Sequence, residues 1–294
     1  MNKATSPLRY PGGKSCLEPL IVQLLKLNKL ERCHYVEPYA GGCGLALALL
    51  FDGYVSDIHV NDLDPAIWCF WHSVLEHNKE LVSLINSTPI TIEEWHKQKA
   101  IQIEANVSNP VELGFSTFFL NRTNRSGIIK KAGPIGGKNQ DGNYKIDCRF
   151  NKENLIERIE RIHKYKSQIN LYNLDAVDFM NNPKNIPDRS FFCIDPPYFK
   201  QGSRLYTSSY EPSDHQQVAE SILSLDHPWI VTYDNADEIK KHYAGKRQFL
   251  FDLNYSVQVK RVGNELLIAS KGLRISPELN ERQLPKTRKS NVCV

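Results

Sequence analysis

The sequence predicts an α/β fold in which an open, largely parallel sheet carries a helical insertion. Short apolar runs end abruptly in acidic or polar residues, as buried strands of a parallel sheet do. One of these runs is followed by a glycine-rich turn and an apolar helix. A middle region, Pro65 to Gln168, shows helical patterns and no strand alternation. Together these features favour a nucleotide-binding type of sheet interrupted by a helical segment.

The chain opens with a segment rich in proline and glycine, Ser6 to Lys14. Gly12 and Gly13 let the backbone approach a ligand closely, and Lys14 adds a positive charge. The segment lacks the spacing and the preceding strand of a phosphate-binding P-loop. A helix is expected next, with one apolar face made of Leu17, Leu20, Ile21, Leu24 and Leu25. The alternative is a turn that only docks this helix.

The first strand is expected at His34–Glu37, followed by a glycine-rich turn to Gly44 and a helix. Such a turn brings a ligand against backbone N–H groups and a helix N-terminus. The second strand, Val55–Val60, is followed by Asp62, about twenty residues after the turn, where such folds bind ribose hydroxyls. Asp64 is expected to cap the next helix.

The middle region contains a long basic loop. A capping-box spacing predicts a helix start at Thr91, and the apolar stretch Phe115–Leu120 ends at Asn121. The loop from Asn121 to Arg149 holds seven basic residues, two acidic residues and five glycines. This composition suits contacts to phosphates and base edges, and the alternative is a solvated mobile loop.

Three further features complete the predicted sheet. A third strand, Asn170–Asp175, ends in an acid, and Trp229–Asn235 reads as another buried strand. Arg247–Leu253 and Glu265–Ser270 are predicted to form a closing hairpin, and the tail from Arg274 is expected to be mobile.

The rest of the chain is organised around the strand Phe191–Ile194, which stops at Asp195-Pro196-Pro197-Tyr198. The prolines cannot donate ladder hydrogen bonds, so the strand ends there and these residues reach the carboxyl edge, where ligands bind. The Asp195 carboxylate and the Pro196 carbonyl are two adjacent acceptors that would satisfy both protons of an NH2 group. The Tyr198 ring offers a face for stacking. The site therefore resembles a clamp for an aromatic amine such as that of adenine, and the alternative is a simple turn.

Composition sets limits on the class of protein. The 294 residues are 41% hydrophobic and 24% charged, and no stretch reaches the roughly 18 apolar residues of a membrane helix. The N-terminus lacks the apolar core of a signal peptide, so a cytoplasmic protein is expected. The net charge is +4, and four basic residues lie near the C-terminus: Arg282, Lys286, Arg288 and Lys289. Since residues 282–294 contain no acidic residue, the rest of the chain is neutral overall. Nucleic-acid binding would therefore depend on local clusters of charge.

Cysteine usage predicts reduced thiols and no bound metal. The seven cysteines are odd in number, include no Cys-x-x-Cys pair, and several lie in apolar runs.

Three motifs in this order resemble the Dam-like (D12 class, group α) DNA adenine-N6 methyltransferases. The opening motif matches Arg9–Lys14, the cofactor turn matches Glu37–Gly44 with Tyr39 where Phe is more usual, and the catalytic motif matches Asp195–Tyr198. The resemblance implies a Rossmann-like methyltransferase sheet with a helical target-recognition insertion. It implies a discontinuous catalytic domain (1–64 and 169–273), a recognition domain (65–168) and a basic tail (274–294).

The resemblance also implies roles for individual residues. The expected ligand is S-adenosylmethionine, contacted by Tyr10, Gly12, Gly13, Lys14, Glu37, Pro38, Tyr39, Gly41, Gly42, Asp62, Asp175 and Asp195. Catalysis is assigned to Asp195, Pro196, Pro197 and Tyr198. The expected DNA-binding residues are Asn121, Arg122, Asn124, Arg125, Lys130, Lys131 and Lys138.

The chemistry agrees with this assignment. Accepting both N6 protons frees the nitrogen lone pair for attack on a methyl group, and the target base must leave the duplex to reach the clamp. The expected partner is double-stranded DNA, with no membrane, no metal and a monomeric enzyme. The alternatives are a cytosine-N4 enzyme, a protein-glutamine or RNA methyltransferase, and an inactive DNA-binding relative. The sequence does not reveal a restriction partner.

Overall fold

The computed structural model describes residues 5–10, 12–182, 186–199, 210–255 and 261–285. Its helices are α1 (Glu18–Leu27), α2 (Gly44–Phe51), α3 (Pro65–Glu76), α4 (Asn78–Ser87), α5 (Ile92–Glu104), α6 (Pro110–Thr123), α7 (Lys152–Lys164), α8 (Ala176–Asn181), α10 (Pro212–Ser224), α11 (Asp237–His242) and α12 (Pro277–Asn280). Short 3-10 turns lie at η1 (Ser15–Leu17), η2 (Arg125–Gly127) and η3 (Lys166–Gln168).

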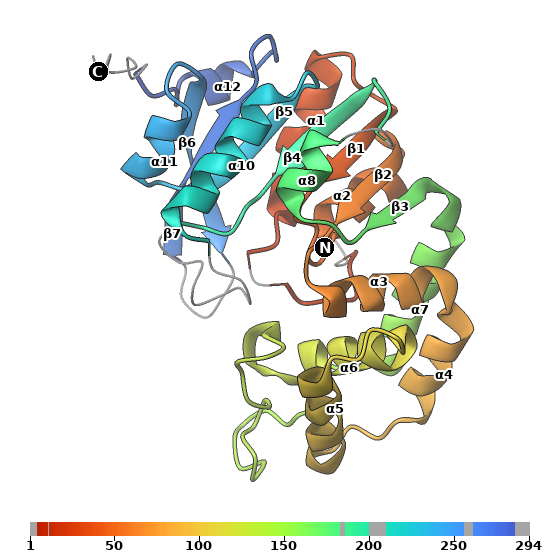
Figure 1. The fold of residues 1–294 in the computed structure, drawn as a ribbon. Helices are drawn as coiled ribbons and strands as arrows, with labels where there is room; N and C mark the ends of the chain where they lie inside the picture. Colours follow the sequence, from red (N-terminus) through yellow and green to blue (C-terminus); the bar gives the residue numbers. More distant parts are fainter. Residues whose placement is uncertain (1–4, 11, 183–185, 200–209, 256–260, 286–294) are drawn as a thin grey trace. The chain divides into compact units, whose positions relative to one another are not determined.

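The strands form one seven-stranded sheet in the order β3-β2-β1-β4-β5-β7-β6 (Figure 1). They are β1 (Cys33–Glu37), β2 (Val55–Asn61), β3 (Ile169–Tyr172), β4 (Ser190–Ile194), β5 (Trp229–Asp234), β6 (Arg247–Tyr255) and β7 (Arg261–Ala269). β1, β4 and β5 run parallel, while β7 is antiparallel to both β5 and β6. The predicted α/β sheet with its closing hairpin is confirmed, and the hairpin is longer than expected.

Packing divides the chain into two compact units, which we call the helical unit and the sheet unit. The helical unit comprises Met1–Gly13, Ala40–Ala48 and Val60–Asn173. The sheet unit comprises Lys14–Tyr39, Leu49–His59 and Leu174–Val294.

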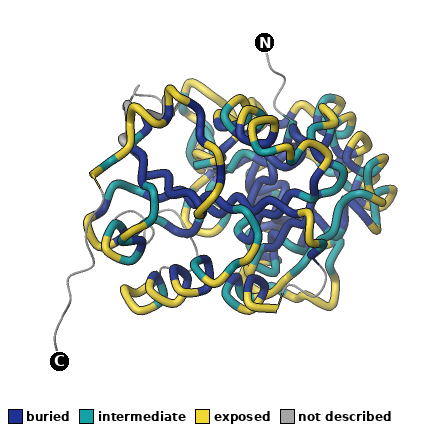
Figure 2. The backbone as a smooth tube through the Cα atoms, turned by 90° about the horizontal axis from the view of Figure 1, so that it is seen from above, coloured by how far each residue is buried: buried dark blue, intermediate teal, exposed yellow. Residues whose placement is uncertain are grey.

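In the sheet unit the central strands are buried because their sequences are apolar on both faces. All five residues of β4 are buried, and Figure 2 colours the backbone by how far each residue is buried. Phe192 pairs in register with Val36 on β1 and with Trp229 on β5. The strand order reverses between β1 and β4, which makes the carboxyl ends of these strands the expected ligand-binding edge. Helices α8 and α10 lie side by side against this sheet (Figure 1).

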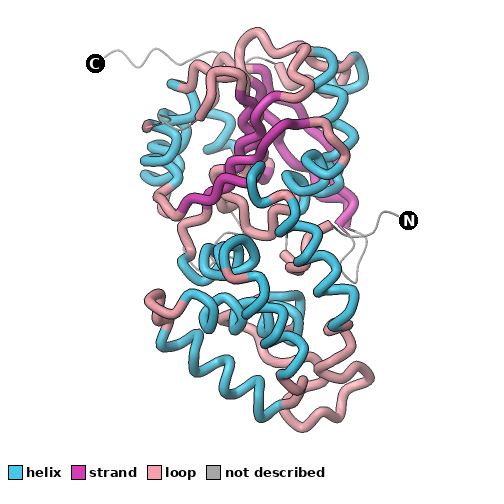
Figure 3. Tube along the Cα trace, turned by 90° about the vertical axis from the view of Figure 1, so that its right-hand side faces the viewer, coloured by secondary structure: helices cyan, strands magenta, loops and turns pink. Residues whose placement is uncertain are grey.

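In the helical unit, α3 and α6 approach closely because small residues face the neighbouring backbone. A Cβ atom added at Gly114 would lie 2.5 Å from the Cys69 carbonyl oxygen. Thr117 Oγ1 donates to the Ala66 carbonyl at 3.1 Å, and the rings of Phe70 and Phe118 stack with centroids 5.7 Å apart. Residues 65–168, all described, contain helices and loops with one isolated β-bridge and no longer strand (Figure 3). The predicted helical character of this region is confirmed.

The N-terminal segment packs within the helical unit, together with the predicted insertion 65–168. Arg158 donates to the Ser6 carbonyl at 3.1 Å, and Asn121 bonds both the N–H and the C=O of Arg9. These hydrogen bonds join residues more than a hundred positions apart, so local sequence patterns do not predict them.

The first residues of the predicted tail 274–294 include regular structure. Residues 277–280 form α12, and the chain then pairs with β6: the N–H of Leu250 donates to Arg282 and the N–H of Leu284 donates to Gln248. Residues 286–294 of the predicted tail lie outside the described residues.

Two local predictions are confirmed by side-chain caps. Thr91 caps α5, its Oγ1 accepting the Glu94 N–H at 3.1 Å, and Asp64 caps α3, its carboxylate accepting the Ala66 N–H at 2.9 Å. The third strand ends at Tyr172, earlier than predicted, because Asp175 is the cap of α8.

Candidate active site and nucleic-acid interface

The central stretch leaves the sheet directly after β4. Asp195 follows Ile194, and Pro196 and Pro197 are buried at the strand end. Thr232 on the neighbouring strand β5 donates from Oγ1 to Asp195 Oδ1 at 2.7 Å, which fixes one carboxylate oxygen. Asp234, at the end of β5, accepts the Phe199 N–H at 2.9 Å and holds the chain beyond Tyr198.

Lys14 lies on this clamp. Its Nζ is 2.9 Å from Asp195 Oδ2, donates to the Tyr198 hydroxyl at 2.7 Å and lies 4.9 Å from the centre of the Tyr198 ring. Only 8% of Lys14 is exposed, so its charge requires a counter-ion inside the protein. The opening motif therefore contributes directly to the catalytic motif, whereas the sequence pattern linked Lys14 only to the cofactor.

Glu265 is a further residue of this cluster that the sequence analysis did not identify. It lies on β7 opposite Asp234, is 3% exposed, and accepts the Tyr198 hydroxyl at Oε1 at 2.6 Å. Burial raises the pKa of Glu265 to about 7, against the opposing effects of Lys14 and of the hydrogen bond from Tyr198. In the sequence, Glu265 is an acid next to the apolar run Leu266–Ala269, which is the type of position that the analysis used to find site residues. Its place beside the clamp depends on the antiparallel register of β5 and β7.

The glycine-rich turn is organised by Tyr10 and Asp62. A Cβ atom at Gly41 would lie 2.6 Å from the Tyr10 ring, and one at Gly42 would lie 2.7 Å from Tyr10 Cβ, so only glycine fits at these two positions. Gly41 also has a φ of 47°. Asp62 Oδ2 accepts the Gly41 N–H at 2.8 Å and Oδ1 accepts the Asp64 N–H at 2.9 Å. The structure thus brings together Tyr10, Gly41, Gly42 and Asp62, all of which were predicted to contact the cofactor.

Burial raises the pKa of Asp62 to about 6, although its two backbone hydrogen bonds favour the ionised form. A carboxylate with this environment retains lone pairs on both oxygens, and these could accept hydroxyl groups of a ligand.

The other predicted cofactor residues are distributed over several elements. Glu37 ends β1, is buried, and accepts the Tyr35 hydroxyl at 3.0 Å; Pro38 follows it and is also buried. The Tyr39 hydroxyl lies 3.2 Å from that of Tyr210. Gly12 has a φ of 78°, and the Gly13 N–H donates to the Tyr10 carbonyl at 3.2 Å, which makes a tight turn. Asp175 uses Oδ1 to cap α8 at Val177 and Asp178.

Two predicted DNA-binding residues, Asn121 and Asn124, are fully buried and hold the loop together. Asn121 lies in the last turn of α6 and donates to the carbonyls of Arg9 and Gly127. Asn124 accepts the Trp95 indole N–H at 2.6 Å and donates to the carbonyls of Ile128 and Ile129. Backbone and indole groups use both amides, so these two side chains have structural contacts here, and their predicted contacts to DNA stay a prediction.

Arg122 is also engaged internally. Its guanidinium donates to the carbonyls of Arg149 and Pro7. Desolvation, followed by the nearby charges of Arg9, Arg158 and Arg149, lowers the pKa of Arg122 to about 10. The side chains of Arg9, Arg149 and Arg158 therefore lie within electrostatic range of Arg122 in the helical unit.

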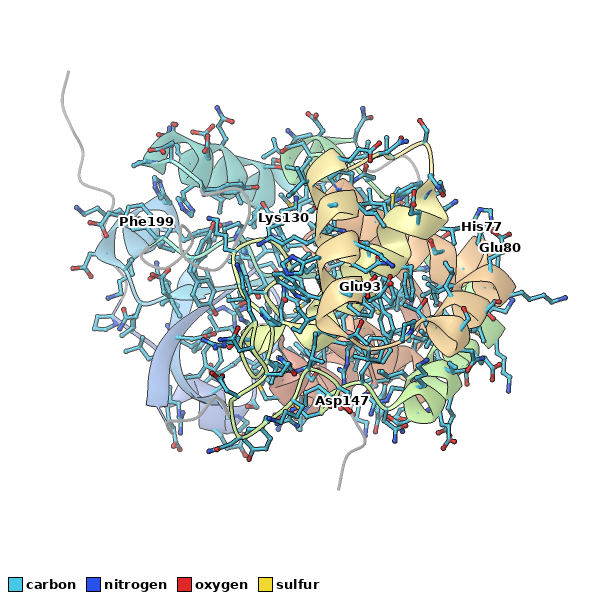
Figure 4. The ribbon with its side chains drawn as sticks, turned by 90° about the horizontal axis from the view of Figure 1, so that it is seen from below. His77, Glu80, Glu93, Lys130, Asp147 and Phe199 are labelled. Carbon is cyan, nitrogen blue, oxygen red and sulfur yellow. The ribbon has the colours of Figure 1, made fainter. Side chains whose placement is uncertain are left out.

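The other predicted DNA-binding residues, Arg125, Lys130, Lys131 and Lys138, have exposed side chains. Lys130 forms an ion pair of 3.3 Å with Asp64. Lys130 and Asp147, labelled in Figure 4, belong to the loop between α6 and α7. The loop is built on hydrogen bonds of Gln140, which donates to Ile135 and Gly137 and accepts from Ile146. The loop therefore has a hydrogen-bond network of its own.

Within the described part of the chain, no group of three His, Cys, Asp or Glu side chains is arranged to hold a metal ion. The helices described there are all too short or too polar to cross a membrane.

The comparisons with known proteins identify the family. Residues 10–258 match the D12 class of N6 adenine-specific DNA methyltransferases, and the chain belongs to this family. It transfers a methyl group to N6 of adenine in DNA. Among solved structures, the rRNA methyltransferase aviRa from Streptomyces viridochromogenes has a TM-score of 0.38 and 13% identity, over 88% of this chain and 85% of that chain. A search of curated proteins gave no match.

Family membership decides among the alternatives that the sequence left open. The match to an adenine-specific DNA family excludes the cytosine-N4, protein-glutamine and RNA readings, and it supports an active enzyme over an inactive DNA-binding relative.

Proposed function

We propose that this enzyme uses S-adenosylmethionine to methylate an adenine that has been flipped out of duplex DNA. The observation that carries the proposal is the position of Asp195 at the carboxyl edge of β4, beside the Pro196 carbonyl and the Tyr198 ring. Asp195 and Pro196 accept the two N6 protons, and Tyr198 stacks on the base. This geometry favours a more tetrahedral nitrogen with a lone pair available for attack.

S-adenosylmethionine, when bound, supplies an electrophilic methyl group. The donor set of this chain suits that ligand: Asp62 offers carboxylate oxygens for ribose hydroxyls, and Gly41 and Gly42 keep the turn at Tyr10 free of side chains. We assign cofactor binding to the residues of the motifs, including Lys14, Glu37 and Asp175. The carboxylate of Asp195 orients the amine and needs no proton transfer before attack.

We further propose that exposed basic side chains of the loop contact DNA phosphates. Arg125, Lys131 and Lys138 are exposed, and Lys130 is exposed beside Asp64. Asn121, Arg122 and Asn124 contribute indirectly, because they hold the loop and the N-terminal segment in place. A base inside the duplex is out of reach of the clamp, which supports base flipping. Because one chain carries all three motifs, we propose that it acts as a monomer, which sedimentation with and without duplex DNA would test.

The experiment that tests the proposal measures transfer of labelled methyl groups from S-adenosylmethionine to unmethylated duplex DNA. Nucleoside analysis should yield N6-methyladenine, and sequencing of methylated positions should define one recognition site. In single turnovers at saturating cofactor, Asp195→Ala should lower the rate by at least about 10²–10³ while DNA affinity changes little, because most affinity comes from contacts elsewhere. More than a tenth of the wild-type rate in Asp195→Ala would overturn the proposed role of the clamp.

A further inference from the structure

The Lys14 ammonium group pairs with the carboxylate that the clamp uses to accept its substrate. Asp195 has two carboxylate oxygens: Oδ1 accepts the Thr232 hydroxyl, and Oδ2 lies 2.9 Å from Lys14 Nζ. Under the proposed function, on which this inference rests, an N6 proton of adenine must be accepted by this carboxylate. The target amine and the Lys14 ammonium group then compete for this carboxylate, and the contact of Lys14 with Asp195 weakens when the base enters.

A buried ammonium group that leaves one carboxylate needs another, because an unpaired charge in a protein interior is costly. Glu265 is placed to provide it. Its Oε2 is buried, has no hydrogen-bond partner among the described residues, and lies 3.9 Å from Lys14 Nζ. Its Oε1 is already engaged with the Tyr198 hydroxyl, to which Lys14 also donates. A displacement of about 1 Å would convert the loose contact of Lys14 with Glu265 into a close ion pair.

We infer that Glu265 is a positioning residue for methyl transfer: it receives the Lys14 ammonium when the target amine displaces it from Asp195, and it fixes the hydroxyl of Tyr198. The step moves no proton and breaks no covalent bond. Lys14 changes its principal partner from Asp195 to Glu265, and the total charge of the cluster is unchanged.

The exchange requires an ionised Glu265. The charged and titratable groups that face it are Lys14 and Cys16 from the N-terminal segment and η1, Asp195 and Tyr198 after β4, and Asp234 on β5. Desolvation and the two aspartates favour the neutral acid, Lys14 and Tyr198 favour the carboxylate, and the resulting pKa is about 7. Protonation below that pH would remove the second partner of Lys14, so the methyl-transfer rate should fall as the pH drops through about 7.

The test compares single-turnover methylation by wild type and Glu265→Gln, with saturating labelled S-adenosylmethionine and a duplex that carries the mapped recognition site. The glutamine keeps the size of the side chain and can accept from Tyr198, but it cannot pair with an ammonium group. We expect at least a tenfold lower rate at pH 8, unchanged DNA affinity, and disappearance of the rate decrease between pH 8 and 6. If protonation of Asp62, whose pKa is about 6, caused the decrease of the rate at acid pH, that decrease would persist in Glu265→Gln.

Ser270→Ala is the matched control. Ser270 directly follows β7, is buried, and accepts the Trp229 N–H at 3.1 Å, far along the strand from the clamp. Removal of this hydroxyl should lower the melting temperature without altering the pH profile. Glu265→Asp, which retains a carboxylate, should restore the acid limb, and it keeps the test decisive if Glu265→Gln fails to fold.

The outcomes separate the two proposals. A wild-type rate that is flat from pH 8 to 6, or a folded Glu265→Gln enzyme with the wild-type rate and pH profile, would overturn the role of Glu265 while Asp195→Ala remains inactive. If the wild-type protein makes no N6-methyladenine, or if Asp195→Ala stays active, the proposed function itself fails.

Discussion

At the scale of single residues, Tyr198 has two separable parts. Its ring is proposed to stack on the flipped base, while its hydroxyl accepts from Lys14 and donates to Glu265. Tyr198→Ala should weaken holding of the base by about 1–3 kcal/mol, the usual value of one stacking interaction. Tyr198→Phe should retain most of that energy but lower protein stability, because Glu265 Oε1 is deprived of its hydrogen bond inside the protein.

Fluorescence of 2-aminopurine at the target position, with thermal melting of each variant, distinguishes these effects. Equally weakened base holding in Tyr198→Ala and Tyr198→Phe would contradict a stacking role for the ring.

Asp62 is expected to serve both the turn and the cofactor. Asp62→Ala should weaken binding of S-adenosylmethionine in calorimetry, since it removes the acceptor for Gly41 N–H and the proposed acceptor for ribose. Asp62→Asn, which keeps one acceptor oxygen, should weaken binding less. Unchanged cofactor affinity in Asp62→Ala would defeat the assignment.

The pH dependence of Asp62 has a defined sign. Because its folded pKa is raised to about 6, the folded state holds the proton more tightly than the unfolded chain. Its contribution to stability is therefore greatest below the ordinary carboxyl pKa and is lost as the pH rises through about 6. Cofactor affinity should change in the opposite direction, and fall as the pH drops below about 6, because ribose hydroxyls are bound better by the ionised acid.

At the scale of elements, the loop between α6 and α7 separates anchoring from DNA binding. Replacement of Arg125, Lys131 and Lys138 by alanine should reduce the slope of log affinity against log salt concentration by about 0.9 for each phosphate that the loop no longer neutralises, with cofactor affinity unchanged. Lys97→Ala on α5 is the matched control, because it removes an exposed charge that pairs with Glu93 in the same helix. A salt slope that stays at the wild-type value in the triple variant would show that the loop does not touch DNA.

At the scale of the whole molecule, the helical unit includes the start of the chain. Asn121 bonds both backbone groups of Arg9, and a Cβ atom at Gly127 would lie 2.2 Å from the Arg9 carbonyl oxygen. Asn121→Ala should therefore release the opening motif from α6 and leave buried backbone groups unsatisfied, at a cost of about 1–3 kcal/mol each. Hydrogen exchange of the Arg9 amide should accelerate strongly, while amides of β4 should keep their protection. Unchanged exchange at Arg9 would contradict this anchoring role.

The local features of the protein follow from short stretches of its sequence. Apolar runs defined the strands, capping chemistry placed the starts of α3 and α5, and the prolines after Asp195 fixed where β4 ends. Motif order also indicated the family correctly, because the three motifs carry their chemistry in short, contiguous stretches.

Which distant groups meet depends on the three-dimensional fold. The antiparallel pairing of β5 and β7 sets Glu265 opposite Asp234, and the fold of the N-terminal segment sets Lys14 against Asp195. Burial likewise decided that Asn121 and Asn124 anchor the loop, although in the sequence they look like exposed polar residues. Local patterns report propensity and periodicity, whereas strand register and desolvation depend on residues far away in the chain.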